Sequence, residues 1–216
     1  MKIISFYDTK PYDKYFFDKQ KEQYDFTINY YEEKLNKHTA RMAEGSDAVV
    51  AFVNDTLDAL TLERLYGLGI RVVGMRCAGY NNIDFSAAKD RIHILRVPAY
   101  SPYAVAEHAM GMALMLNRKL HRAYNRTREY NFSLNGLTGF DFHGKTIGVV
   151  GTGKIGQAFI DLCIGFGMKV LAFDPYPMPR EGVTYVDMDT LCRDSSVISL
   201  HCPLTKDTKH IINADS

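Results

Sequence analysis

From Lys145 to Asp174 the chain reads KTIGVVGTGKIGQAFIDLCIGFGMKVLAFD. The opening apolar run, residues 145–150, is rich in β-branched side chains and predicts a buried parallel strand. A helix is predicted next, and Gly165 and Gly167 mark where it should stop. One face of that helix should carry its apolar side chains, which are Ile155, Phe159, Leu162, Cys163 and Phe166. A second strand is predicted at residues 170–173, so that Asp174 stands at its carboxyl end.

The turn between this strand and helix carries the pattern G-x-G-x-x-G, as Gly151-Thr152-Gly153-Lys154-Ile155-Gly156. Gly151 permits a tight turn, Gly153 lets the backbone approach a pyrophosphate with no Cβ in the way, and Gly156 allows helix and strand to pack closely. Unpaired N–H groups and the positive end of the helix dipole would face the phosphates. The pattern is therefore typical of a dinucleotide-binding turn.

Asp174 adds a second signal, because it lies 18 residues after Gly156. At that place a carboxylate can accept hydrogen bonds from both ribose hydroxyls of an adenosine, and it would repel a 2′-phosphate. NAD is therefore the expected cofactor, in preference to NADP. A glycine-rich turn of another α/β protein, or a site for a different adenosine cofactor, are the alternative interpretations.

Composition narrows the class of protein. The chain has 216 residues, of which 46% are apolar, and its net charge is +1 with no basic block. Nothing in it indicates binding to nucleic acid or to a membrane surface, and no apolar run approaches the ~20 residues that cross a bilayer. Four cysteines without C-x-x-C spacing indicate buried thiols in a reducing cytoplasm. The histidines do not have metal-binding spacing, so no metal site is expected.

The first hundred residues alternate predicted strands with predicted helices. Strands are expected at residues 2–7, 25–31, 48–53, 70–75 and 92–97. Helices are expected at residues 10–24, 56–68 and, briefly, through 87–88. This β-α-β alternation predicts a parallel sheet with helices on both faces, separate from the unit around Lys145. A domain boundary is predicted at residues 98–102, where Ser101 would cap the next helix and Pro102 would begin it.

Beyond the boundary, residues 104–120 are nearly all apolar and predict a helix buried between layers. Residues 118–128 are basic, and a solvated helix face or a subunit contact explains them without nucleic acid. A turn-rich connection after Asp174 leads to a short helix at residues 187–193 and a third strand at 197–200. A dinucleotide-binding domain has two β-α-β-α-β halves, so we expect this sequence to be the leading part of a longer protein.

Several motifs occur in a fixed order along the chain. They are RCAGYNNID at 76–84, VPAYSP at 97–102 with AVAEH at 104–108, GTGKIG at 151–156, FDPY at 173–176 and HCPLT at 201–205. With them the whole chain resembles the D-isomer-specific 2-hydroxyacid dehydrogenases, and among these the fermentative D-lactate dehydrogenases of bacteria. The resemblance implies an α/β protein with a flavodoxin-like substrate domain at residues 1–100, incomplete here, and the first half of a Rossmann NAD-binding domain at residues 101–216.

The same resemblance implies roles for individual residues. The backbone at Ala78 and Gly79 would bind the substrate carboxylate, with Tyr100 nearby. The cofactor would contact the three glycines of the turn together with Lys154, Ile155, Asp174, Val105, Cys202, Pro203 and Thr208. Relatives often carry Asn at the position of Thr208. The family's catalytic arginine, glutamate and histidine would lie beyond Ser216, so the chain is expected to be inactive by itself.

The leading functional prediction is NAD-dependent interconversion of pyruvate and D-lactate in the cytoplasm by a homo-oligomer, as the resemblance implies. A dehydrogenase of another 2-hydroxy or 2-keto acid, and a non-catalytic NAD-sensing protein, are the alternatives. Two histidines invite a catalytic interpretation, His108 on the apolar helix and His201 at a strand end. A structural hydrogen bond is favoured for His108, and a cap on the strand for His201.

Overall fold

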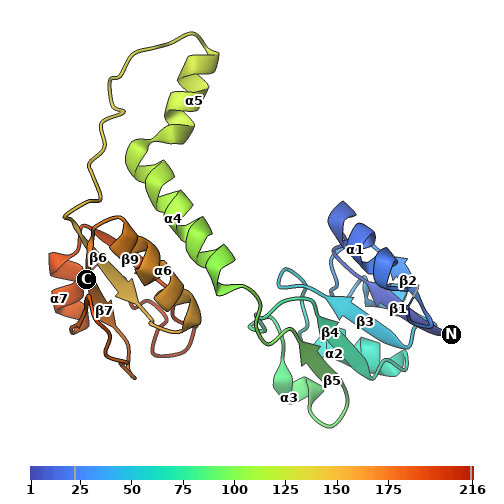
Figure 1. Ribbon diagram of the computed structural model, residues 1–216. Coiled ribbons are helices and arrows are strands. Elements are labelled where there is room, and N and C mark those ends of the chain that lie inside the picture. Colours follow the sequence, from blue (N-terminus) through green and yellow to red (C-terminus); the bar gives the residue numbers. More distant parts are fainter. Residues whose placement is uncertain (22, 215) are drawn as a thin grey trace. The chain divides into compact units, whose positions relative to one another are not determined.

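A computed structural model describes residues 1–21, 23–214 and 216 (Figure 1). The chain divides into two compact units, Met1–Tyr100 and Ser101–Ser216. Each unit contains its own parallel sheet. No helix in the described part of the chain is both long and apolar enough to cross a bilayer.

The sheet of the first unit has five parallel strands. They are β1 (Lys2–Phe6), β2 (Phe26–Tyr30), β3 (Ala48–Ala51), β4 (Val72–Met75) and β5 (His93–Arg96), in the order β2-β1-β3-β4-β5. All five strands predicted in this half are confirmed, and β3 lies at the centre, as its continuous apolar run indicated. Its Val49 and Ala51, which share one face of the strand, are fully buried, and Ala48 and Val50 on the other face are partly buried.

Helices accompany this sheet at α1 (Pro11–Lys21), α2 (Ala59–Gly67) and α3 (Phe85–Ala88), with a 3₁₀ turn, η1, at Ala40–Ala43. The sequence placed the start of α2 at residue 56, three residues too early. Asp58 is the residue before the helix, and its carboxylate accepts the amide hydrogen of Thr61. A side-chain cap of this kind fixes where a helix begins.

The second unit contains a four-stranded parallel sheet. Its strands are β6 (Thr146–Val150), β7 (Lys169–Phe173), β8 (Val183–Tyr185) and β9 (Val197–Leu200), in the order β8-β7-β6-β9. The strands predicted around the glycine turn are confirmed. The sequence did not predict β8, because three residues are too few to show the alternation of apolar and polar side chains that marks a strand. Two helices belong to this sheet, α6 (Lys154–Gly165) after the glycine turn and α7 (Met188–Asp194) before β9.

The buried face of α6 differs in part from the predicted one. Phe159 and Cys163 are buried as expected, but Phe166 is 39% exposed, and Ile160 is fully buried instead. Gly156 and Ala158 are also buried. The wider buried stripe follows from two partners, because α6 packs against the sheet and also against α4 (Pro102–Arg118).

The prediction that the apolar helix after residue 104 is buried between layers was wrong. Within α4 only Ala106 and Met110 are buried, and Leu116 is 65% exposed. One stripe packs on α6, and no element of the described second unit covers the rest. His108 is exposed and makes no hydrogen bond among the described residues, so its predicted structural bond is not seen. Lys119, in a left-handed conformation, separates α4 from α5 (Leu120–Arg128).

Candidate dinucleotide and carboxylate sites

The glycine turn between β6 and α6 is held by close backbone packing. Gly151 has a φ of 92°, in the left-handed region that favours glycine. A Cβ there would lie 2.7 Å from the amide nitrogen of Cys202. A Cβ on Gly156 would lie 2.1 Å from the carbonyl oxygen of Gly151. Both glycines are therefore required for the helix to start this close to the ends of β6 and β9.

The middle glycine has a different environment. No atom lies within 4 Å of the place where a Cβ on Gly153 would stand. Among the described residues, the backbone amides of Gly153, Lys154 and Ile155 donate no hydrogen bond. Free N–H groups at a helix N-terminus, beside open space and a lysine, suit a phosphate group. These residues therefore fit the pyrophosphate of a dinucleotide.

Asp174 stands at the carboxyl end of β7, against the same turn. Its Oδ2 accepts from the amide of Thr152 at 2.7 Å and from the hydroxyl of Thr152 at 3.0 Å, and its Oδ1 accepts from the amide of Tyr176 at 2.9 Å. Burial raises the pKa of this carboxyl group, but these hydrogen bonds outweigh burial and hold the pKa of Asp174 below its usual range. Three of about four lone-pair positions are thus taken, which leaves room on Oδ1 for roughly one ribose hydroxyl.

A hollow of about 500 Å³ opens beside the turn and includes Gly153 and Lys154. Asp174, Val105 and Cys202 are not among its lining residues. Thr208 uses its hydroxyl within its own loop, where it donates to the carbonyl oxygen of Pro203. The structure thus gathers the turn residues with Asp174, and the predicted cofactor contacts do not all line this hollow.

His201 follows β9 and lies beneath the turn. Its Nε2 is 3.0 Å from the Ser199 hydroxyl, and its ring centroid is 4.8 Å from that of Phe159. Burial lowers the pKa of His201, so the ring is neutral at physiological pH. These contacts fit the structural interpretation of this histidine.

In the first unit, the loop after β4 presents two free amides. Among the described residues, the N–H groups of Ala78 and Gly79 donate no hydrogen bond. The carbonyl groups of the loop are engaged instead: Val97 donates to Cys77, Arg96 donates to Ala78, and the Cys77 thiol donates to Gly79. In a trans peptide the C=O and the next N–H point in opposite directions. Holding the carbonyls of Cys77 and Ala78 therefore fixes the directions of the Ala78 and Gly79 N–H groups, which remain available to an anion.

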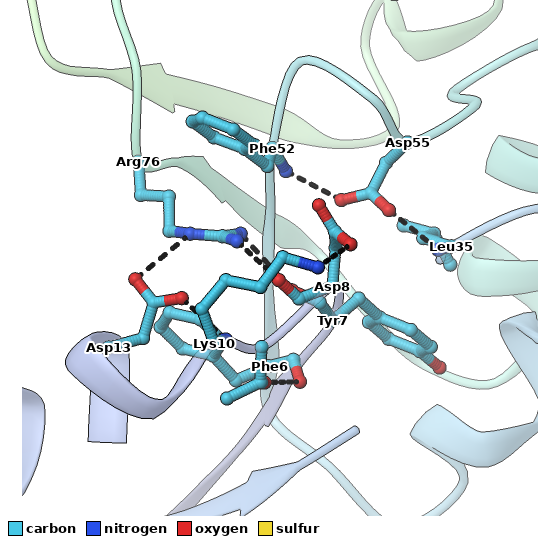
Figure 2. Close-up of polar contacts among 10 residues, drawn as sticks. Phe6, Tyr7, Asp8, Lys10, Asp13, Leu35, Phe52, Asp55 and Arg76 are labelled. Atoms are coloured by element: carbon cyan, nitrogen blue, oxygen red, sulfur yellow. Dashed lines mark hydrogen bonds and ion pairs between the residues drawn. The ribbon is translucent and has the colours of Figure 1, made fainter. Parts of the chain in front are cut away.

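Arg76, the residue before this loop, is enclosed by the ends of β1 and β3 (Figure 2). Its Nε is 3.4 Å from Oδ1 of Asp13, and both side chains are under a tenth exposed. Its two Nη atoms donate to the carbonyl oxygens of Tyr7 and Asp8 at 3.1 and 2.7 Å. The guanidinium also lies 4.4 Å from the centroid of the Phe52 ring. The charge of Arg76 is paired with Asp13, and both of its Nη atoms are hydrogen-bonded to backbone carbonyls. Arg76 therefore has a structural role at this end of the sheet.

Two of the three predicted substrate residues line separate hollows of the first unit, and Ala78 lines neither of them. Tyr100 lines one of about 490 Å³, together with Phe52, Arg76 and Cys77. Gly79 lines another of about 350 Å³, together with Val53 and Asn82. The Tyr100 side chain is 60% exposed. The structure does not gather Ala78, Gly79 and Tyr100 around one cavity within this unit.

Sequence reasoning missed three contributions to these sites, those of Arg96, Thr152 and Tyr185. Each acts through a hydrogen bond to a group far along the chain, and no periodic signal marks such a bond. The motif spacing could have pointed to Thr152, which is the first variable position of G-x-G-x-x-G. In the described residues no group of three or more His, Cys, Asp or Glu side chains is arranged to hold a metal ion.

Comparison with known proteins identifies the family. A family model described as "D-isomer specific 2-hydroxyacid dehydrogenase, NAD binding domain" matches residues 110–216. D-lactate dehydrogenase of Escherichia coli is 50% identical over 97% of this chain, and a 2-hydroxyacid dehydrogenase homolog of Haemophilus influenzae is 47% identical over 99%. The chain spans 65% and 66% of the lengths of these two curated relatives.

Solved structures give the same result. The apo-structure of D-lactate dehydrogenase from Escherichia coli superposes with a TM-score of 0.90 at 50% identity, covering 98% of this chain and 68% of that one. D-lactate dehydrogenase from Aquifex aeolicus, complexed with NAD and lactic acid, superposes with a TM-score of 0.80 at 31% identity, covering 97% and 63%. The chain belongs to the D-isomer-specific 2-hydroxyacid dehydrogenase family, whose cofactor is NAD.

Proposed function

We propose that this chain supplies the adenosine side of the NAD site and the carboxylate cradle of a dehydrogenase that interconverts pyruvate and D-lactate. The observation that supports this most strongly is the placement of Asp174 against the glycine turn. An ionised carboxylate, fixed by the Thr152 amide, stands next to three free amides that suit a pyrophosphate. A carboxylate beside free amides can bind the ribose and the pyrophosphate at the adenosine end of a dinucleotide.

The cofactor's role and the chain's role are distinct. NAD supplies the hydride chemistry when it is bound. In this proposal the amides of Gly153, Lys154 and Ile155 hold its pyrophosphate, and Asp174 accepts a ribose hydroxyl and repels a 2′-phosphate. Val105, Cys202, Pro203 and Thr208 are the further proposed cofactor contacts.

The substrate's carboxylate would be held by the amides of Ala78 and Gly79, with Tyr100 as a further contact. Two N–H donors directed at one anion stabilise its charge by hydrogen bonding, without a buried positive charge. Reduction of the keto group also needs a proton donor and a cation that orients the substrate. Arg76 and His201 are each engaged in structural contacts, so we propose that an arginine, a glutamate and a histidine outside these 216 residues supply those functions.

The chain's assembly and compartment are also part of the proposal. Large apolar side chains are exposed along α4, α5 and the loop that follows, among them Leu116, Leu120, Tyr124, Phe132 and Leu134. Figure 1 shows α5 and this loop extending away from the sheet of the second unit. An exposed apolar surface of this kind is typical of a protein interface, and we propose a homo-oligomer. The four free thiols fit a reducing cytoplasm.

Turnover tests the function. The 216-residue chain is compared with a chimera in which the C-terminal part of the Escherichia coli enzyme, beyond the matched region, follows Ser216. We expect pyruvate-dependent NADH oxidation, with D-lactate as product, from the chimera and none from the chain alone. Loss of general acid catalysis alone typically removes about 10²–10⁴-fold in rate. Comparable turnover by both proteins, or a folded chimera that reduces only bulkier 2-keto acids, would contradict the proposal.

A further inference from the structure

The side chain of Thr152 is buried at the centre of the adenosine side. The residue is 2% exposed, and its hydroxyl and amide both donate to Oδ2 of Asp174. Because the pKa of Asp174 is held low by its hydrogen bonds, the carboxylate is ionised and can only accept. The hydroxyl proton of Thr152 must therefore point at Asp174.

A tyrosine from the neighbouring strand completes this arrangement. Tyr185 ends β8, and its backbone pairs with Ala172 of β7. Its hydroxyl lies 3.2 Å from Oγ1 of Thr152 and 2.9 Å from the carbonyl oxygen of Met178. The Thr152 proton is committed to Asp174, so Oγ1 of Thr152 and the carbonyl oxygen of Met178 are alternative acceptors for the one hydroxyl proton of Tyr185. Tyr185 thus contacts Thr152, and Thr152 in turn donates to Asp174.

We propose that Thr152 and Tyr185 are positioning residues that set the preference for NAD over NADP by fixing the Asp174 carboxylate in one orientation. The inference rests on the proposed function, since it assumes that this site binds the adenosine of a dinucleotide. A carboxylate that loses one of these three hydrogen bonds can rotate more freely away from an incoming 2′-phosphate, which weakens the repulsion. With Oδ2 bonded twice and Oδ1 bonded by Tyr176, the negative charge stays where that phosphate would lie.

Two small probes isolate this part of the site. ADP-ribose and ADP-ribose 2′-phosphate contain the adenosine and pyrophosphate but no nicotinamide, so they report on the residues of this chain alone. Affinities are measured by titration calorimetry on the 216-residue chain. The readout is the ratio of the two dissociation constants, which a general loss of stability would not change.

Thr152→Val removes the hydroxyl while keeping the amide and the approximate shape. We expect it to lower the preference for ADP-ribose about three- to tenfold, the change typical of one lost hydrogen bond. Tyr185→Phe should lower the preference less and in the same direction. Thr152→Ser keeps the hydroxyl and should keep the ratio. Thr184→Val, at an exposed threonine of β8, is the matched control and should also keep it.

An unchanged ratio in folded Thr152→Val, with ADP-ribose still bound by the parent chain, would overturn the inference and leave the proposed function intact. If circular dichroism shows that Thr152→Val does not fold, the same ratio is measured in Thr152→Ala, and an unchanged ratio there overturns the inference. A ratio that falls equally in Thr152→Ser would also count against it, because the hydroxyl would then be irrelevant. Failure of the parent chain to bind either probe would overturn the proposed function itself, and the inference with it.

Discussion

The guanidinium of Arg96 donates a hydrogen bond of 3.0 Å to the carbonyl oxygen of Ala78. Arg96 ends β5, and Ala78 lies in the loop after β4, so the bond joins the carboxyl ends of neighbouring strands. It fixes the peptide between Ala78 and Gly79, whose N–H points the opposite way. A charged donor on the carbonyl also polarises this peptide, which strengthens the N–H as a donor. The peptide proposed to bind the substrate carboxylate is therefore held from behind by a residue that need not touch the substrate.

Substitution of Arg96 tests this relationship. In the chimeric enzyme, Arg96→Met should raise the KM for pyruvate about two- to tenfold, as expected for one lost hydrogen bond. The KM for NADH should not change. Steady-state kinetics measure both, with Arg91→Met as the control at an exposed arginine of the same unit. An unaltered KM for pyruvate would show that the loop keeps its shape without Arg96.

The ion pair between Arg76 and Asp13 should support stability. Arg76→Met leaves the carboxylate of Asp13 buried without its partner, and breaking a buried pair in this way typically costs about 3–5 kcal/mol. Adding Asp13→Asn should recover part of the loss, because the uncompensated charge is then gone. Urea unfolding followed by circular dichroism measures both free energies, with Arg91→Met again as the control. A double variant no more stable than Arg76→Met would speak against charge burial as the cause.

Gly153 and Gly156 should respond differently to added side chains. Gly153→Val places carbon atoms in open space where a pyrophosphate is proposed, so ADP-ribose binding should be lost while the fold is kept. Gly156→Ala should instead destabilise the fold, since its Cβ would meet the Gly151 carbonyl at 2.1 Å. Gly165→Val, also facing open space at the end of α6, is the control and should bind normally. Normal ADP-ribose affinity in Gly153→Val would mean that this turn holds no phosphate.

The sequence predicted those features that local patterns determine. Apolar runs located β3 and β6, and the spacing of Gly151, Gly153 and Gly156 before Asp174 indicated the dinucleotide site. These patterns are readable because each element buries its own periodic side chains. The start of α2 was misplaced, since the sequence before it offers several polar residues and only the folded chain shows that Asp58 caps.

Features that depend on distant partners could not be read in this way. The exposure of Leu116 depends on which elements pack against α4. The apolar pattern of the helix does not show which elements these are. The short strand β8 exists because β7 offers it an edge. Thr152 and Arg96 became site residues only when the fold placed their hydrogen bonds on Asp174 and Ala78.

Asp174 should control cofactor choice, which the ratio of kcat/KM for NADH to that for NADPH in the chimeric enzyme reports. This ratio is measured before and after Asp174→Ala. We predict a strong preference for NADH in the parent and a clear fall in the variant, because the fixed charge that repels a 2′-phosphate is removed. An unchanged ratio would contradict the assignment of this residue, and with it the central claim that the segment from Lys145 to Asp174 binds the adenosine side of NAD.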